Sequence, residues 1–180
     1  AGHVRIYERD EGNTTVEPLG WTQLGSDIDG EAASDVSGWS VSLDSDGDRV
    51  AIGAYLNSND GTASQAGHVR IYEYSNSSWS QLGSDIDGER EDDRSGWSVS
   101  LNSDGDRVAI GAYQNSHIVP PVPFIDAGHV RVYEYSNSSW SQLGSDIDGE
   151  ALYDESGYSV SLNSDGDRVA IGARYNDGTA

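Results

Sequence analysis

The sequence predicts an all-β protein built from tandem antiparallel sheets, and three observations lead to this fold class. Long segments recur three times along the 180 residues, each copy contains short runs of alternating or β-branched residues, and turn-forming residues separate these runs. No segment shows a sustained helical period. Repetition of one small unit is typical of folds in which neighbouring units bury each other's faces.

Four segments define the repeat. They are Gly-His-Val-Arg-Ile/Val-Tyr from Gly2, Gly67 and Gly128; Trp-x-Gln-Leu-Gly-Ser-Asp-Ile-Asp-Gly-Glu from Trp21, Trp79 and Trp140; Ser-Gly-Trp/Tyr-Ser-Val-Ser-Leu from Ser37, Ser95 and Ser156; and Arg-Val-Ala-Ile-Gly-Ala from Arg49, Arg107 and Arg168. We interpret 1–180 as a single repeat domain, with repeats at approximately 1–65, 66–126 and 127–180. An insertion near residue 120 is rich in proline and is expected to be a stiff surface loop.

The middle copy shows the expected strands in order. Residues 97–101 alternate Trp, Val and Leu with Ser, which predicts a strand with one apolar face. The turn 102–106, with its Asp-Gly pair, leads into the short and nearly all-apolar run 108–112. The β-branched and aromatic run 130–135 follows, and a Ser-rich turn leads to the last run, 140–143. Each copy is therefore expected to be a four-stranded antiparallel meander.

The face patterns predict how the copies pack. The run Val-Ala-Ile-Gly-Ala is small on one face and branched on the other, as expected of a sheet covered on both sides by like sheets. Blades around a propeller axis fit this pattern, with the small-residue strand innermost, so we predict a fold of the β-propeller type. A β-sandwich is the alternative. It accounts for the number of strands but not for their strict grouping in sets of four.

The copies add up to three blade-equivalents of four-stranded antiparallel sheet, with half-blades at each terminus. Closed propellers have about four to eight blades, so three do not easily close around an axis. We therefore expect self-association, as a paired ring or as a filament of swapped half-blades, or contact with neighbouring repeats of a longer chain. Ala1 lies inside a repeat, which predicts a processed chain, a fragment or part of something longer.

Composition narrows the function classes. The formal net charge is -21, from 31 acidic and 10 basic residues, all of the latter Arg. Such a surface argues against nucleic acid as a partner and against anionic lipid, and no apolar stretch is long enough for membrane insertion. The negative charge suits a medium rich in cations, which screen its self-repulsion. Alternatively, the charge only keeps a repetitive β protein soluble. Without Cys there is no disulfide framework and no thiol chemistry.

The segment Ser95–Leu101 followed by Asp104–Ala112 resembles the integrin-alpha-like, FG-GAP family of β-propeller repeats. The other segments resemble the extended version of this repeat in large secreted proteins of microbes and algae. The resemblance implies an extracellular or cell-surface location and a role in adhesion or matrix structure. The chain departs from the family where the acidic turn runs directly into Arg49, because the family's last calcium ligand has no counterpart there.

Two sets of carboxylates are candidate calcium (Ca²⁺) ligands. The first set occupies the acidic turns and comprises Asp44, Asp46 and Asp48; Asp104 and Asp106; and Asp165 and Asp167. The second set occupies the connections between copies and comprises Asp27, Asp29, Glu31 and Asp35; Asp85, Asp87, Glu89 and Asp93; and Asp146, Asp148, Glu150 and Asp154. The alternative for the turns is a structural hairpin, and for the connections a solvated loop whose Asp residues cap backbone donors.

Other recurring side chains have structural interpretations. His3, His68 and His129 stand once per repeat, and equivalent residues of separate blades are too far apart to share a metal, so we interpret them as hydrogen-bonding residues. The Arg residues are expected to pair with carboxylates.

The aromatic residues fall into two recurring positions. One position is expected to pack between blades, and the other either packs in the core or forms an exposed platform for sugars. The first position is held by Trp39, Trp97 and Tyr158, and the second by Trp21, Trp79 and Trp140.

The repeat favours a structural or adhesion module over an enzyme, because no unique polar cluster breaks it. We expect an extracellular module, stabilised by calcium, that acts through multivalent contacts with proteins, matrix or glycans. A carbohydrate-binding, lectin-like propeller is the alternative. Asn13, Asn76 and Asn137 lie in Asn-x-Ser/Thr sequons and are candidates for glycosylation in a secreted protein.

Overall fold

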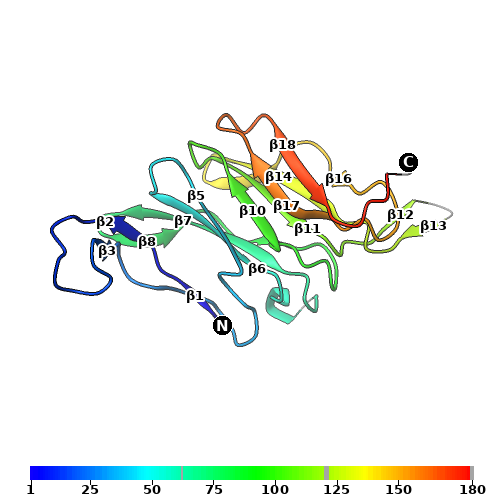
Figure 1. Cartoon of the computed structure of the whole chain (residues 1–180). Coiled ribbons are helices and arrows are strands. Elements are labelled where there is room, and N and C mark those ends of the chain that lie inside the picture. Colours follow the sequence, from blue (N-terminus) through cyan, green and yellow to red (C-terminus); the bar gives the residue numbers. More distant parts are fainter. Residues whose placement is uncertain (62, 120–121, 179–180) are drawn as a thin grey trace.

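The computed structural model describes residues 1–61, 63–119 and 122–178 and shows an all-β chain of antiparallel sheets that follow one another in chain order (Figure 1). The N-terminal part contains β1 (His3–Val4), β2 (Tyr7–Arg9), β3 (Trp21–Gln23) and β4 (Ile28–Asp29). The first complete sheet contains β5 (Ser40–Leu43), β6 (Arg49–Ala54), β7 (His68–Ser75), β8 (Ser78–Gln81) and β9 (Ile86–Asp87). The second contains β10 (Ser98–Leu101), β11 (Arg107–Ala112), β14 (His129–Ser136), β15 (Ser139–Gln142) and β16 (Ile147–Asp148). The last two strands are β17 (Ser156–Leu162) and β18 (Val169–Ala173).

Two short elements lie in the connections. The 3₁₀ helix η1 (Asn59–Gly61) follows β6, and the hairpin of β12 (His117–Val119) and β13 (Val122–Phe124) occupies the insertion near residue 120. The insertion expected to be a loop therefore pairs with itself. No helix in the described ranges is long and apolar enough to cross a membrane.

Each complete sheet has five strands rather than the four expected. In the first sheet the order is β5-β6-β7-β8, and β9 also pairs with β7. The eight-residue β7 has room for both, because β8 pairs with its end, Tyr72–Ser75, and β9 pairs with its start, His68–Val69. The hairpin between β7 and β8 turns at Asn76 and Ser77, which both have positive φ, as a tight two-residue hairpin requires.

A half-sheet lies at each end of the chain, as the order of the repeated segments predicted. β1 to β4 correspond to the last strands of a complete sheet, because β1 pairs with β4 as β7 pairs with β9. β17 and β18 correspond to its first two strands.

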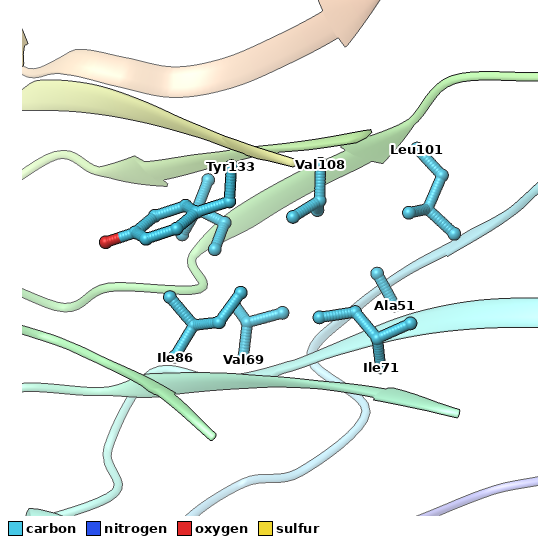
Figure 2. Close-up of a cluster of buried hydrophobic side chains, with 8 residues drawn as sticks. Ala51, Val69, Ile71, Ile86, Leu101, Val108 and Tyr133 are labelled. Carbon is cyan, nitrogen blue, oxygen red and sulfur yellow. The ribbon is translucent and has the colours of Figure 1, made fainter. Parts of the chain in front are cut away.

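The apolar core lies between consecutive sheets, so both faces of the central strand β6 are buried. On one face of the first complete sheet, Val50 and Ile52 of β6 pack against the N-terminal half-sheet, in a cluster with Val4, Ile6 and Ile28. The opposite face of this sheet packs against the second complete sheet. Figure 2 shows this second cluster, in which Leu101, Val108 and Tyr133 point toward Ala51, Val69, Ile71 and Ile86. Each fully buried Val or Ile contributes roughly 1.5–3 kcal/mol, so these two layers supply much of the stability.

Glycine is needed where consecutive sheets approach most closely. A Cβ on Gly53 would collide with the carbonyl oxygen of Gly96, and one on Gly111 with that of Gly157. The predicted small face of the strand is therefore confirmed. Its predicted innermost position is wrong, because β6 and β11 each lie second in their sheet, between the edge strand and the long strand. A strand this short and apolar is best covered there, with a partner on each side.

The edge strands β5, β10 and β17 carry the alternating serines, and these join one sheet to the next. The Ser42 hydroxyl accepts a hydrogen bond from the Leu101 N–H at 3.0 Å, and the Ser100 hydroxyl accepts one from Leu162 at 2.9 Å. Ser40 in turn donates to the Gly96 carbonyl at 2.7 Å. Serine at alternate positions is therefore used to connect consecutive sheets.

An aromatic column runs across the same junctions. The ring centroids of Trp39 and Trp97 are 4.7 Å apart, and those of Trp97 and Tyr158 are 5.4 Å apart. Tyr55 and Tyr113 also pack against Trp97, at 5.0 and 4.5 Å. The prediction that Trp39, Trp97 and Tyr158 pack between sheets is confirmed.

Candidate functional site

Each junction between consecutive repeats brings an imidazole and two carboxylates together from three separate segments. At the first junction they are Glu31, from the connection after β4; His68, the first residue of β7; and Asp85, which directly precedes β9. One ligand atom of each residue lies within 4.8 Å of the others. The pairing of β9 with the start of β7 places Asp85 beside the ring, and the preceding repeat supplies Glu31.

The ring of His68 is almost completely buried, with 3% of its side chain exposed. Its Nδ1 lies 3.5 Å from Asp85 Oδ2 and 3.8 Å from Glu31 Oε2, which exceeds the usual hydrogen-bond range of about 2.7–3.2 Å. Burial lowers the pKa of His68, and the two carboxylates raise it less strongly. At neutral pH the ring is therefore neutral and offers a lone pair.

The second oxygen of each carboxylate is held by another side chain. Gln81 Nε2 donates to Asp85 Oδ1 at 2.6 Å, and Arg70 Nη1 lies 3.3 Å from Glu31 Oε1. The buried Arg70 also donates from Nη2 to the Asp29 carbonyl at 3.0 Å, so it joins β7 to the preceding connection. These contacts leave one oxygen of each carboxylate directed at the ring of His68. They also confirm, for Arg70 of β7, that Arg pairs with a carboxylate.

An acidic hollow of about 430 Å³ opens over this cluster. Its lining combines four carboxylates with the ring: Glu31, Asp85, Asp87, Glu89 and His68, together with Asn57, Asn59, Ala63 and Gly88. Carboxylates gathered in one hollow repel each other unless a cation joins them, so the site is suited to a positively charged group.

The second junction repeats the arrangement. Glu89, His129 and Asp146 also lie with one ligand atom each within 4.8 Å of the others. His129 Nδ1 is 3.6 Å from Asp146 Oδ2, and Gln142 holds the other oxygen of Asp146 at 2.8 Å. Arg131 lies 3.6 Å from Glu89 and donates to the Asp87 carbonyl at 2.8 Å. The contacts thus belong to the junction and recur with the repeat.

The carboxylates of one connection do not gather into one site. Glu31 and Glu89 join the His of the following repeat, and Asp85 and Asp146 lie near the His of their own repeat. Asp27 instead lies 3.9 Å from Arg5. Each His also pairs across its sheet with an Asp of its own repeat, which lies in β4, β9 or β16. These residues are Asp29, Asp87 and Asp148. Glu150 lies 3.5 Å from the amide of Asn176.

The last Asp of each connection is a buried cap of the loop. Asp35, Asp93 and Asp154 are buried and accept a backbone N–H three residues back, at 3.0, 2.9 and 2.9 Å. Asn57 and Asn176 also bond Asp35 and Asp154, at 3.2 and 2.9 Å. Burial raises the pKa of Asp93 to about 6, although Asn115 and the Arg90 N–H oppose this. The alternative interpretation, Asp residues that cap backbone donors, describes these three.

The acidic turns are closed by their own hydrogen bonds. Asp44 accepts the N–H groups of Gly47 and Arg49 at 2.8 and 3.2 Å, and Asn102 accepts that of Arg107 at 2.9 Å. Asn102 also donates to Asp106 at 2.7 Å, as Asn163 does to Asp167. The described turns bring no three carboxylates together, Asp46, Asp104 and Asp165 included. This geometry favours the structural hairpin, and calcium binding at the turns stays a prediction.

The sequons and the second set of tryptophans occupy different surroundings. Asn76 and Asn137 lie in exposed turns, whereas the amide of Asn13 donates to the Trp21 carbonyl at 2.8 Å. Trp79 and Trp140 donate their indole N–H to the Leu24 and Leu82 carbonyls, both at 2.8 Å. These two tryptophans therefore join consecutive repeats, and of this set only Trp21 is an exposed ring.

The grouping of His with carboxylates was not predicted from the sequence, because only a metal shared between His residues was considered. The structure instead joins His68 and His129 each to one acid of its own repeat and one of the preceding repeat. A recurrent spacing was available: Asp85 follows His68, and Asp146 follows His129, by the same number of residues. No protein-family model and no curated protein matches the chain, so the resemblance to FG-GAP repeats stays a prediction.

Proposed function

We propose that this chain is an extracellular structural or adhesion module of the β-propeller type, without catalytic activity, which acts through multivalent contacts. One observation supports this most: the polar groups that recur in each repeat connect that repeat to the next. Catalysis needs a unique constellation, whereas equivalent sites along an array suit multivalent binding, in which weak contacts add up.

The partner that best fits the ends of the chain is another repeat, from a second copy or from a longer chain. Val41 and Leu43 on β5 are 54% and 48% exposed, whereas Leu101, the residue of β10 equivalent to Leu43, is 7% exposed because a complete sheet precedes it. β18 has only β17 as a partner among the described strands, whereas β6 pairs with both β5 and β7. Strands like β17 and β18 from a neighbour would cover β5 and complete the N-terminal half-sheet. Unpaired edges of this kind favour association.

Sedimentation velocity over a range of concentrations tests this proposal. We expect assemblies larger than the 19.2 kDa chain, and we expect Val41→Asp to weaken them because it places a charge on the apolar face of β5. Val16→Asp, in the exposed loop between β2 and β3, is the matched control and should assemble like the wild type. A chain that stays monomeric at all concentrations would contradict assembly between copies.

A further inference from the structure

The two junction clusters have the donor set and the spacing of a metal site, which goes beyond a structural or adhesion role. We propose that each junction binds one first-row divalent transition-metal ion, such as Zn²⁺, through His Nδ1, the Asp of the same repeat and the Glu of the preceding repeat. The ligands are Glu31, His68 and Asp85 at the first junction, and Glu89, His129 and Asp146 at the second.

The separations between the donor atoms support this assignment. Zn²⁺ bonds to imidazole nitrogen and carboxylate oxygen are about 2.0–2.2 Å long, which places two ligand atoms of a tetrahedron roughly 3.4 Å apart. His68 Nδ1 lies 3.5 Å from Asp85 Oδ2 and 3.8 Å from Glu31 Oε2. These atoms are too far apart for good hydrogen bonds, but an ion between them needs only small movements of the side chains.

The position of His68 gives a second indication. Its side chain is 3% exposed, it lines the acidic hollow, and its Nδ1 lies 3.5 Å from Asp85 and 3.8 Å from Glu31. A buried imidazole nitrogen normally has a partner at hydrogen-bond distance, and both of these contacts are longer than that. A metal ion on Nδ1 would satisfy it, and the hollow leaves room for water as a further ligand.

Side chains around the ligands fix their orientation. Gln81 and Gln142 each hold one carboxylate oxygen and leave the other facing the ring, at 2.6 and 2.8 Å. Arg70 holds Glu31 in the same way at 3.3 Å. Such outer contacts are a regular feature of protein metal sites, where they orient the ligands.

The donor set selects the class of ion. Calcium takes six to eight oxygen ligands, and imidazole nitrogen is not among its usual ligands. A mixture of imidazole and carboxylate suits zinc and its neighbours in the first transition row. At the junctions we therefore propose a transition-metal ion in place of calcium.

Isothermal titration of the full chain with ZnCl₂, in a buffer that contains millimolar CaCl₂ to occupy weak acidic sites, tests the proposal. We expect two equivalents of Zn²⁺ per chain, one in His68→Ala, and none in the double variant His68→Ala/His129→Ala. His3→Ala is the matched control and should keep both, because no Glu of a preceding repeat faces His3 in the described chain. Absence of saturable binding, equal binding by the double variant, or displacement by calcium would overturn the proposal.

A variant that keeps all three ligands guards against loss of fold. Gln81→Ala should leave the circular dichroism spectrum unchanged and weaken binding at the first junction by about tenfold, as loss of an outer-shell contact does in other metal sites. Absorption of the Co²⁺-loaded chain gives a second readout, since tetrahedral coordination gives Co²⁺ much more intense visible bands than the free ion has. If Gln81→Ala binds like the wild type at both junctions, and Co²⁺ gives only the spectrum of the free ion, the assignment is wrong.

Discussion

His68 and His3 occupy the same place in their repeats, but their surroundings differ. His68 is buried between Glu31 of the preceding connection and Asp85 of its own, whereas His3 is exposed and accepts a hydrogen bond from Arg5 Nε at 3.2 Å. The same contrast separates Arg70, which is buried, from Arg5, whose side chain is 46% exposed. The comparison shows that a repeat alone does not form the site. The site is formed where one repeat packs against the next.

The largest effect is expected where two sheets approach most closely. Gly53→Ala places a Cβ against the Gly96 carbonyl and should destabilise the chain by about 3 kcal/mol, because backbone atoms there must move. Gly172→Ala is the matched control, since the new Cβ would meet mainly the movable side chain of Ser159. Urea denaturation measures both, and equal costs would show that the sheet junction does not matter.

The buried arginine provides the next test. Arg70→Ala removes the contacts with Glu31 and Asp29 together with the packing of a buried stem, and should cost about 2–3 kcal/mol. Arg5→Ala should cost less than about 0.5 kcal/mol, because exposed ion pairs contribute little. Chemical denaturation of the two variants under the same conditions decides the matter. Similar losses would contradict a role for the preceding repeat.

Asp93 should make stability depend on pH. Its pKa in the folded state is about 6, above the ordinary value of 3.8, so the folded state holds this proton more tightly than the unfolded state does. Its contribution to stability is present below about pH 4 and is lost as the pH rises through 6, a change of about 2–3 kcal/mol.

Asp93→Asn isolates this contribution from the general charge of the chain. The variant should gain stability relative to the wild type between pH 4.5 and 7, measured by urea denaturation at both values. Asp104→Asn, in an exposed turn, is the control and should show no such gain. If the difference between Asp93→Asn and the wild type is the same at both pH values, Asp93 does not carry this proton.

Local pattern predicted the strands well and the contacts between repeats poorly. The alternation of Trp, Val and Leu with Ser predicted β5 and β10, and the small and branched faces of β6 predicted a sheet covered on both sides. Ile86–Asp87 was missed as a strand because two residues leave no periodic signal, and its pairing depends on the length of β7. The junction cluster was missed because Glu31 and His68 meet only when two sheets pack.

The most direct test of the account is hydrogen exchange at the Leu101 amide, measured by NMR in the wild type and in Ser42→Ala. This N–H donates to the Ser42 hydroxyl of the preceding repeat at 3.0 Å, and the Leu162 N–H makes the equivalent bond to Ser100. If consecutive sheets lie face to face, both amides exchange slowly in the wild type, and Ser42→Ala accelerates exchange at Leu101 while Leu162 stays protected. Fast exchange at Leu101 in the wild type, or exchange there that Ser42→Ala leaves unchanged, would contradict the stacked arrangement.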